Sequence, residues 1–85
     1  MSTNQNNNQK HKFFMDLALQ QAKINLGNTN KNPSVGCVIV KKNSVISVGS
    51  TSFNGRPHAE HNAISDSKVS ISNSELYVTL EPFSH

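Results

Sequence analysis

The sequence predicts an α/β domain whose elements follow the order helix, strand, strand, helix, strand. Two observations support this prediction. Residues 35–40 form a run that is apolar on both faces, as expected for a central strand covered on two sides. A helical repeat of apolar residues precedes this run at 10–26, and a second one follows it at 58–68. The chain of 85 residues has room for one small domain of this kind.

The N-terminal region divides at residue 10. Residues 1–9 are rich in Asn and Gln and almost free of apolar side chains, so we expect a disordered polar tail there and the folded domain at 10–85. The helix expected at 10–26 is followed by Gly27, a typical stop residue. Its apolar residues form two neighbouring stripes, Phe13, Leu17 and Ile24 on one and Phe14, Ala18 and Ala22 on the other.

A hairpin is expected in the middle of the chain. Turn residues 41–44 separate the central strand from a return strand at 45–49. A polar loop follows at 50–56, with Gly55 as its pivot.

A second helix and a third strand complete the pattern. The helix at 58–68 is expected to face the sheet through Ala59, Ala63 and Ile64. The third strand is expected at 75–80, where a proline soon ends it. If the helix joins two parallel strands of one sheet, the connection is right-handed.

Composition and charge narrow the range of partners. The net charge is +3 and the lysines are scattered, without alternation with aromatic residues, so a nucleic-acid partner is not indicated. A mildly basic surface suits a small anionic molecule. The longest apolar run, 35–40, is far too short to span a membrane, and no signal peptide is recognisable. The single cysteine, Cys37, excludes an intramolecular disulfide and fits a cytoplasmic setting.

The sequence His58-Ala59-Glu60 opens the second helix. The positive partial charge of a helix N-terminus disfavours a protonated imidazole, which keeps a nitrogen lone pair available for a metal, and favours an ionised glutamate. His58 could then hold a metal while Glu60 reaches a bound water. The same pattern also fits a helix-capping histidine beside a solvated glutamate.

A second motif favours the metal interpretation. Zinc nucleobase deaminases carry the signature H-x-E…P-C-x-x-C. After the helix and one strand, this chain has Glu81-Pro82-Phe83, so the match is complete up to the cysteine.

Three blocks of sequence together resemble a known family. They are NPSVGCVIV at 32–40, GRPHAE at 55–60 and YVTLEPFSH at 77–85. In this order and spacing they resemble the deaminase domain of the RibD family of riboflavin biosynthesis, within the cytidine-deaminase-like superfamily, over residues 13–85. The resemblance implies a three-layer α/β/α cytidine-deaminase-like fold, of which 10–85 would form the N-terminal portion, an incomplete domain.

The resemblance also implies roles for individual residues. His58 matches the zinc ligand of the family, and Glu60 matches the proton shuttle between zinc-bound water and the departing ammonia. Residues matching the substrate pocket are Asn32, Val35, Gly36 and, beside the metal, His85. The implied reaction is the zinc-dependent hydrolytic deamination of diaminohydroxyphosphoribosylaminopyrimidine, a small pyrimidine ribosylamine phosphate. A homo-oligomer is expected for the full-length family.

The chain departs from the family pattern at the metal. Phe83 stands where the first zinc cysteine is expected, and the second expected cysteine is absent from the chain. A phenyl ring cannot coordinate zinc, so the resemblance implies that zinc is not retained and that the chain is inactive as given. Thr51 stands where the family often has a histidine, and Arg56 could meet the substrate phosphate.

Three alternatives stay open on the sequence. A rearranged metal site could use His58, His61 and His85. The protein could be another nucleobase or nucleoside deaminase of the same superfamily. It could also be a metal-free pseudo-enzyme or structural subunit.

Overall fold

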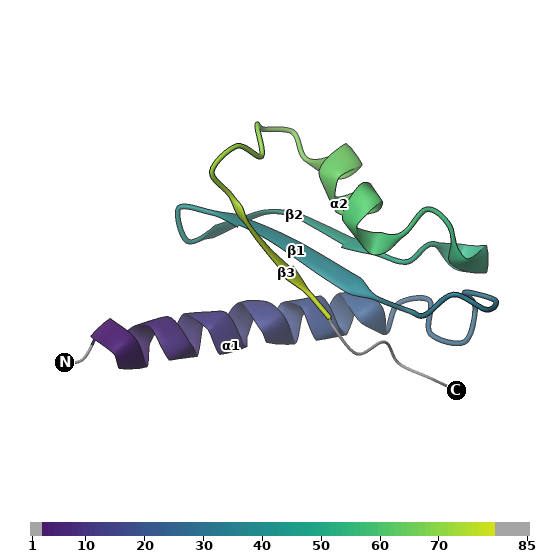
Figure 1. Cartoon of the computed structure of the whole chain (residues 1–85), viewed down its shortest axis with the longest axis horizontal. Coiled ribbons are helices and arrows are strands. Elements are labelled where there is room, and N and C mark those ends of the chain that lie inside the picture. Colours follow the sequence, from purple (N-terminus) through teal and green to yellow (C-terminus); the bar gives the residue numbers. More distant parts are fainter. Residues whose placement is uncertain (1–2, 80–85) are drawn as a thin grey trace.

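The computed structural model describes residues 3–79 and has the expected order of elements (Figure 1). They are helix α1 (Thr3–Ala22), strand β1 (Gly36–Lys41), strand β2 (Ser44–Ser50), helix α2 (Ala59–Asp66) and strand β3 (Glu75–Val78). The loop after β2 contains a short 3-10 helix, η1 (Phe53–Gly55), which the sequence did not predict. Among the described helices, none has both the length and the apolar character needed to cross a membrane.

The strands form one sheet in the order β2-β1-β3, with β1 in the centre. Both outer strands run antiparallel to β1, so β2 and β3 point the same way and α2 connects them across the central strand. Val38 pairs with Val48 on one side and with Tyr77 on the other, and the β2 ladder has an irregularity after Ile39. Helix α1 covers one face of the sheet and α2 covers the other (Figure 1).

The central strand divides its side chains between two cores. Val38 and Val40 pack with Phe14 of α1, whereas Cys37 and Ile39 pack under α2. These four residues of β1 are each at most 1% exposed. The prediction of a central strand covered on both faces is therefore confirmed.

The two apolar stripes of the N-terminal helical region differ in burial. Phe14, Ala18 and Ala22 are buried, whereas Phe13 and Ile24 are 58% and 60% exposed. Each residue turns a helix by about 100°, so the contact with the sheet follows the buried stripe, and from the other stripe Leu17 packs partly against the same core.

The bounds of α1 also differ from those expected. The helix begins at Thr3 instead of residue 10, and so includes most of the polar stretch 1–9. Extending a formed helix is much easier than nucleating one, which accounts for this growth into a sequence of low apolar content. The regular helix ends at Ala22, and tighter turns then continue to Gly27, whose φ is +86°.

Helix α2 follows the same principle as α1. Ala59 and Ala63 are fully buried against the sheet, as predicted, whereas Ile64 is 45% exposed because it lies one position beyond the contact line. The helix ends at Asp66 instead of residue 68. At this end, the N–H of Ser67 donates to the Ile64 carbonyl at 3.3 Å.

Two glycines let the helices approach the sheet at backbone distance. A Cβ atom at Gly36 would lie 2.6 Å from the Ala22 nitrogen and closer still to the Ala18 carbonyl oxygen. A Cβ atom at Gly49 would lie 2.5 Å from the Ala63 nitrogen. Such distances cannot be relieved by turning a side chain, because the opposing atoms belong to the helix backbones.

We expect Gly36→Ala to lower the free energy of unfolding by about 3 kcal/mol, since α1 must move off the sheet. The matched control is Gly27→Ala, where no atom lies within 4 Å and only the positive φ is penalised. That change should cost about 1 kcal/mol. Urea denaturation followed by circular dichroism compares the two, and equal losses would show that the contact at Gly36 is not close.

Candidate active site

A pocket of about 290 Å³ lies where the start of α2 meets the loops that flank the sheet. It is formed by the loop before β1, the loop after β2, the first turn of α2 and the end of β3. Its lining residues are Pro33, Val35, Thr51, His58, Glu60, Val78 and Thr79. The structure therefore brings together four of the residues singled out in the sequence: His58, Glu60, Val35 and Thr51.

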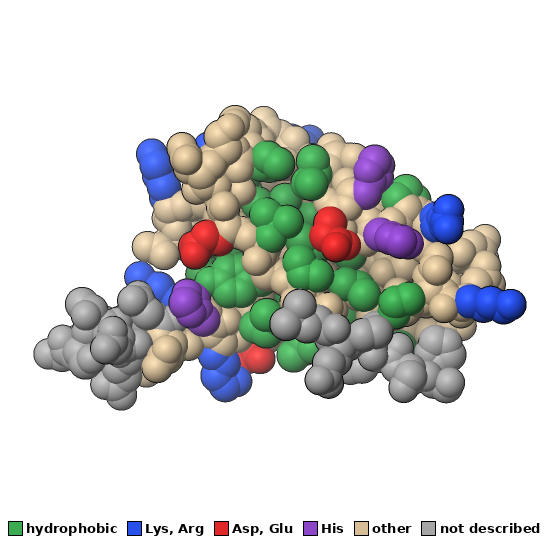
Figure 2. Space-filling model, viewed as in Figure 1, with side chains coloured by type: hydrophobic (Ala, Val, Ile, Leu, Met, Phe, Trp, Pro, Cys, Tyr) green, Lys and Arg blue, Asp and Glu red, His purple; other side chains and the backbone are tan. Residues whose placement is uncertain are grey.

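His58 is the N-cap residue of α2, with extended backbone angles, but its side chain makes no capping hydrogen bond. Glu60 lies in the first turn of the helix, and both side chains are exposed. Histidine and acidic side chains are visible together on one face of the molecule in Figure 2. The interpretation of His58 as a side-chain cap is therefore not supported, and its ring is available to a ligand.

Asn62 holds the loop that leads into α2, a role that the sequence analysis missed. Its side-chain nitrogen donates to the Ser50 carbonyl at 2.7 Å and to the Ser52 hydroxyl at 2.8 Å. It also approaches the Pro57 carbonyl at 3.2 Å, and that carbonyl accepts the Ser52 N–H at 3.0 Å. Asn has a low helix propensity, so its presence inside α2 was the feature of the sequence that could have indicated a hydrogen-bonding role.

Thr51 forms part of the pocket wall through its hydroxyl group. Its Oγ1 accepts the Val35 N–H at 2.9 Å and donates to the Pro33 carbonyl at 3.1 Å. The Thr51 N–H in turn donates to the Val35 carbonyl at 2.9 Å. The side chain is 1% exposed, so Thr51 fixes the loop before β1 and has little surface to offer a substrate.

Two other predicted site residues, Asn32 and Gly36, are not part of the lining of this pocket. Asn32 is half-buried, and its side-chain nitrogen donates to the Gly55 carbonyl at 2.9 Å. Gly36 lies under α1, and its N–H donates to the Thr79 hydroxyl at 3.1 Å. Neither residue lines the pocket that contains His58. Phe83 and His85 lie outside the described residues.

Cys37 lies behind the pocket on the α2 side of β1 and is fully buried. Burial, followed by the negative charge of Glu60, raises the pKa of its thiol to about 11. A thiol must lose its proton to bind a metal, so Cys37 is a poor ligand at neutral pH.

The described part of the chain does not by itself fit a zinc ion. A catalytic zinc needs three protein ligands. Residues 3–79 contain no group of three or more His, Cys, Asp or Glu side chains placed to hold a metal. His61 lines a shallow depression of about 500 Å³ with Arg56, Pro57 and His58, so two of the three histidines of the rearranged site share one surface.

Comparison with known proteins identifies similar chains. The model of the family described as "Cytidine and deoxycytidylate deaminase zinc-binding region" matches residues 8–85. The riboflavin biosynthesis protein RibD of Chlamydia pneumoniae is 42% identical over 73 residues, which are 86% of this chain and 19% of that protein. The diaminohydroxyphosphoribosylamino-pyrimidine deaminase of Buchnera aphidicola (subsp. Schizaphis graminum) is 37% identical over 89% of this chain and 52% of its own length.

A solved structure shows the same likeness. The diaminohydroxyphosphoribosylaminopyrimidine deaminase/5-amino-6-(5-phosphoribosylamino)uracil reductase of Thermotoga maritima superposes with a TM-score of 0.80 and 39% identity. The match covers 91% of this chain and 23% of that one. This chain thus spans between a fifth and a half of the length of the relatives it matches.

We expect Thr51→Val to lower the free energy of unfolding by about 1–3 kcal/mol, because the Val35 N–H and the Pro33 carbonyl lose a buried partner. Thr51→Ser keeps the hydroxyl and serves as the control. Urea denaturation measures both. A Thr51→Val variant as stable as Thr51→Ser would show that the hydrogen bonds of the hydroxyl contribute no more than the methyl group that Ser lacks.

The raised pKa of Cys37 predicts a loss of stability at alkaline pH. The folded state keeps the thiol proton up to about pH 11, whereas the unfolded chain releases it near the ordinary value of 9.0. Stability is therefore complete below pH 9 and falls as the pH rises toward 11, by roughly 2–3 kcal/mol.

The control for this prediction is Cys37→Ala, measured by denaturation from pH 7 to pH 11. Burial and then the charge of Glu75 also raise the pKa of Tyr77, so both proteins share that titration. The titration of Cys37 is therefore measured by the difference between the two proteins in how steeply stability falls with pH. Parallel curves would contradict the assignment.

Proposed function

Since the chain belongs to the family of cytidine and deoxycytidylate deaminase zinc-binding regions, we propose that its pocket serves the hydrolytic deamination of a pyrimidine. The same family match and the solved relatives confirm the expected cytidine-deaminase-like α/β fold. The proposed substrate is the diaminohydroxyphosphoribosylaminopyrimidine after which the relatives are named. The whole reaction would be that of a cytoplasmic enzyme acting on a small molecule.

One observation carries this proposal: His58 and Glu60 line the same pocket at the start of α2. The lining also includes Val35 and Val78, whose apolar side chains suit the faces of a flat ring. An apolar pocket with a few converging polar groups is typical of small-molecule sites.

Glu60 is the proposed proton carrier. In hydrolytic deamination, a water oxygen adds to the ring carbon that bears the amino group, the carbon–nitrogen bond breaks and ammonia leaves. A carboxylate at this position can take a proton from the water and give one to the leaving nitrogen. The exposure of Glu60 to the pocket supports this role.

We further propose that the chain of 85 residues does not hold zinc by itself and does not turn over substrate by itself. The support is the donor set. His58 is the available nitrogen donor in the pocket, Cys37 is buried and protonated, and Phe83 occupies the position of an expected cysteine. No reaction step is therefore assigned to a metal in this chain.

The names of the relatives favour a riboflavin-type pyrimidine deaminase over a deaminase of free bases or nucleosides. Phe83 instead favours the remaining alternative, a metal-free structural subunit. The zinc content of the purified protein distinguishes a zinc-dependent deaminase from a metal-free subunit.

The test compares zinc content in three proteins. The chain itself and its Phe83→Cys variant should bind substoichiometric zinc, because one or two ligands leave the ion exposed. The third carries Phe83→Cys and continues beyond residue 85 with the matching segment of the Chlamydia pneumoniae relative, through its next cysteine. This chimera should bind one zinc per chain and release ammonia from the pyrimidine phosphate.

Two controls accompany this comparison. The same chimera with Phe83 retained should bind no stoichiometric zinc, and Glu60→Gln in the active chimera should reduce ammonia release by at least about a hundredfold. One tightly bound zinc in the unmodified chain would refute the proposed loss of the metal. It would make His61 or His85 a ligand.

A further inference from the structure

We propose that Lys31 and Arg56 bind the phosphate group of the substrate, in a depression beside the deaminase pocket. This inference rests on the proposed function, because it locates the second end of a pyrimidine ribosylamine phosphate. The depression is about 570 Å³ and is called the basic cradle below. Its lining residues are Asn30, Lys31, Asn32, Asn54 and Arg56.

The described lining of the basic cradle is positively charged. It contains two cations and three neutral amides, with no acidic residue. The salt bridge found within residues 3–79 joins Lys12 to Asp16, so no carboxylate in that part of the chain pairs with Lys31 or Arg56. The guanidinium of an arginine offers a planar fork of donors that matches a phosphate, and a lysine adds a point charge.

The two loops that form the basic cradle are fastened to each other. The Asn54 N–H donates to the Asn28 carbonyl at 2.6 Å, and the Asn30 side chain donates to the Asn54 carbonyl at 3.1 Å. The Asn32 side chain donates to the Gly55 carbonyl at 2.9 Å. A site whose loops are already held together loses less conformational entropy on binding. The asparagines thus build the site, and the two cations supply its charge.

The basic cradle and the deaminase pocket each share a lining residue with a third hollow that lies between them. Arg56 lines both the basic cradle and the depression that it forms with Pro57, His58 and His61. His58 lines both that depression and the pocket that contains Glu60. Histidine and basic side chains gather at one end of the face in Figure 2, next to an acidic side chain. A ligand with a pyrimidine ring at one end and a phosphate at the other would follow this path.

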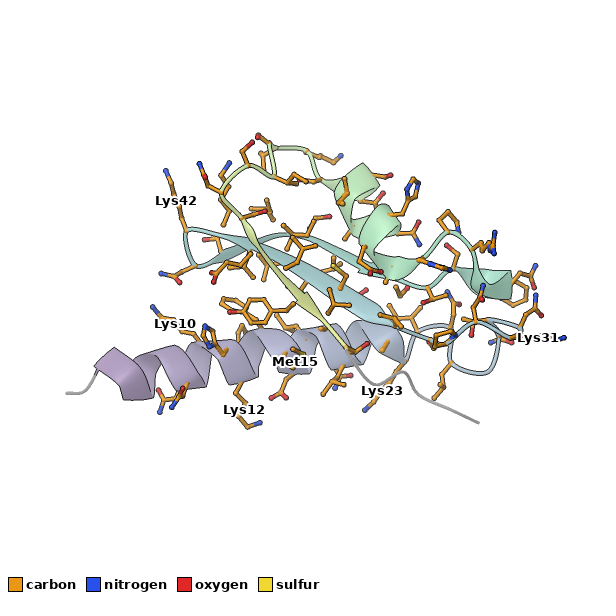
Figure 3. All side chains as sticks on the ribbon, viewed as in Figure 1. Lys10, Lys12, Met15, Lys23, Lys31 and Lys42 are labelled. Atoms are coloured by element: carbon orange, nitrogen blue, oxygen red, sulfur yellow. The ribbon has the colours of Figure 1, made fainter. Side chains whose placement is uncertain are left out.

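The structure offers a matched control for the charge of Lys31. Lys42 lies in the turn between β1 and β2, and Figure 3 places these two lysines at opposite ends of the molecule. Lys31→Gln and Lys42→Gln remove the same charge from exposed positions, so general electrostatics should change alike. Only the first should affect binding in the basic cradle.

The experiment is a titration of the labelled chain with ribose 5-phosphate, followed by amide NMR signals. We expect shifts concentrated at 30–32 and 54–56, none with ribose, and roughly tenfold weaker binding in Lys31→Gln and Arg56→Gln. Lys42→Gln should bind within about twofold of the unchanged chain. Equal weakening by Lys42→Gln, or the absence of localised shifts, would overturn the proposal.

A second arm separates this proposal from the deaminase function. The proposed pyrimidine ribosylamine without its phosphate should shift signals of Val35 and Glu60 and should bind Lys31→Gln and the unchanged chain equally. If this compound does not bind but ribose 5-phosphate does, the deaminase proposal fails and the basic cradle stands. If this compound binds and ribose 5-phosphate does not, the basic cradle is wrong and the deaminase pocket stands.

A kinetic readout extends the test to an active protein. In the zinc-binding chimera described above, Lys31→Gln and Arg56→Gln should each raise KM about tenfold for the phosphorylated substrate while kcat changes little. Such a split identifies lost ground-state binding, whereas a folding defect would lower the amount of active enzyme and leave KM unchanged. An unchanged KM in both variants would overturn the proposal even if the NMR titration failed for lack of soluble chain.

Discussion

Both helices can lie on the sheet at backbone distance because Gly36 and Gly49 have no side chains. The first glycine receives α1 and the second receives α2, on opposite faces of neighbouring strands. This close approach explains why alanines lie at the closest contacts of each helix with the sheet, Ala18 and Ala22 in α1 and Ala59 and Ala63 in α2. The layered arrangement therefore depends on two positions where a single methyl group would collide with helix backbone.

The position of the candidate active site follows from the contact at Gly49. Because Ala59 and Ala63 are seated there, the first turn of α2 is fixed relative to β1 and the loops at its end. Asn62, on the same helix, then fastens the preceding loop to the carbonyls of Ser50 and Pro57. His58 and Glu60 consequently project from a rigid helix start, while apolar packing holds their backbone in place.

The sequence was sufficient to predict the order of elements and the location of His58 and Glu60 at one helix start, while the roles of these two residues stay predictions. A strand that is apolar on both faces needs a layer on each side, and a His-x-Glu start of a helix places two polar side chains at one helix end. The sequence could not reveal which stripe of α1 is buried, since that choice depends on the contact with Gly36 in the folded state. The contacts of Asn32 and Gly36 could not be read from the sequence either. The Asn32 side chain donates to a loop carbonyl, and Gly36 packs against α1.

The hydrogen bonds distinguish the polar groups that hold the fold together from the polar groups that are free to meet a ligand. In the described part of the chain, no buried side-chain nitrogen or oxygen lacks a partner. The neutral polar groups near the pocket, those of Thr51, Asn32 and Asn62, are used within the protein. The charged or ionisable groups on the neighbouring hollows are solvent-exposed instead, so a ligand can replace water there without breaking the fold. A single exposed charge is ordinary, but neighbouring hollows whose neutral polar groups hold the loops and whose charged groups face outward have an arrangement that suits the proposed polar, anionic substrate.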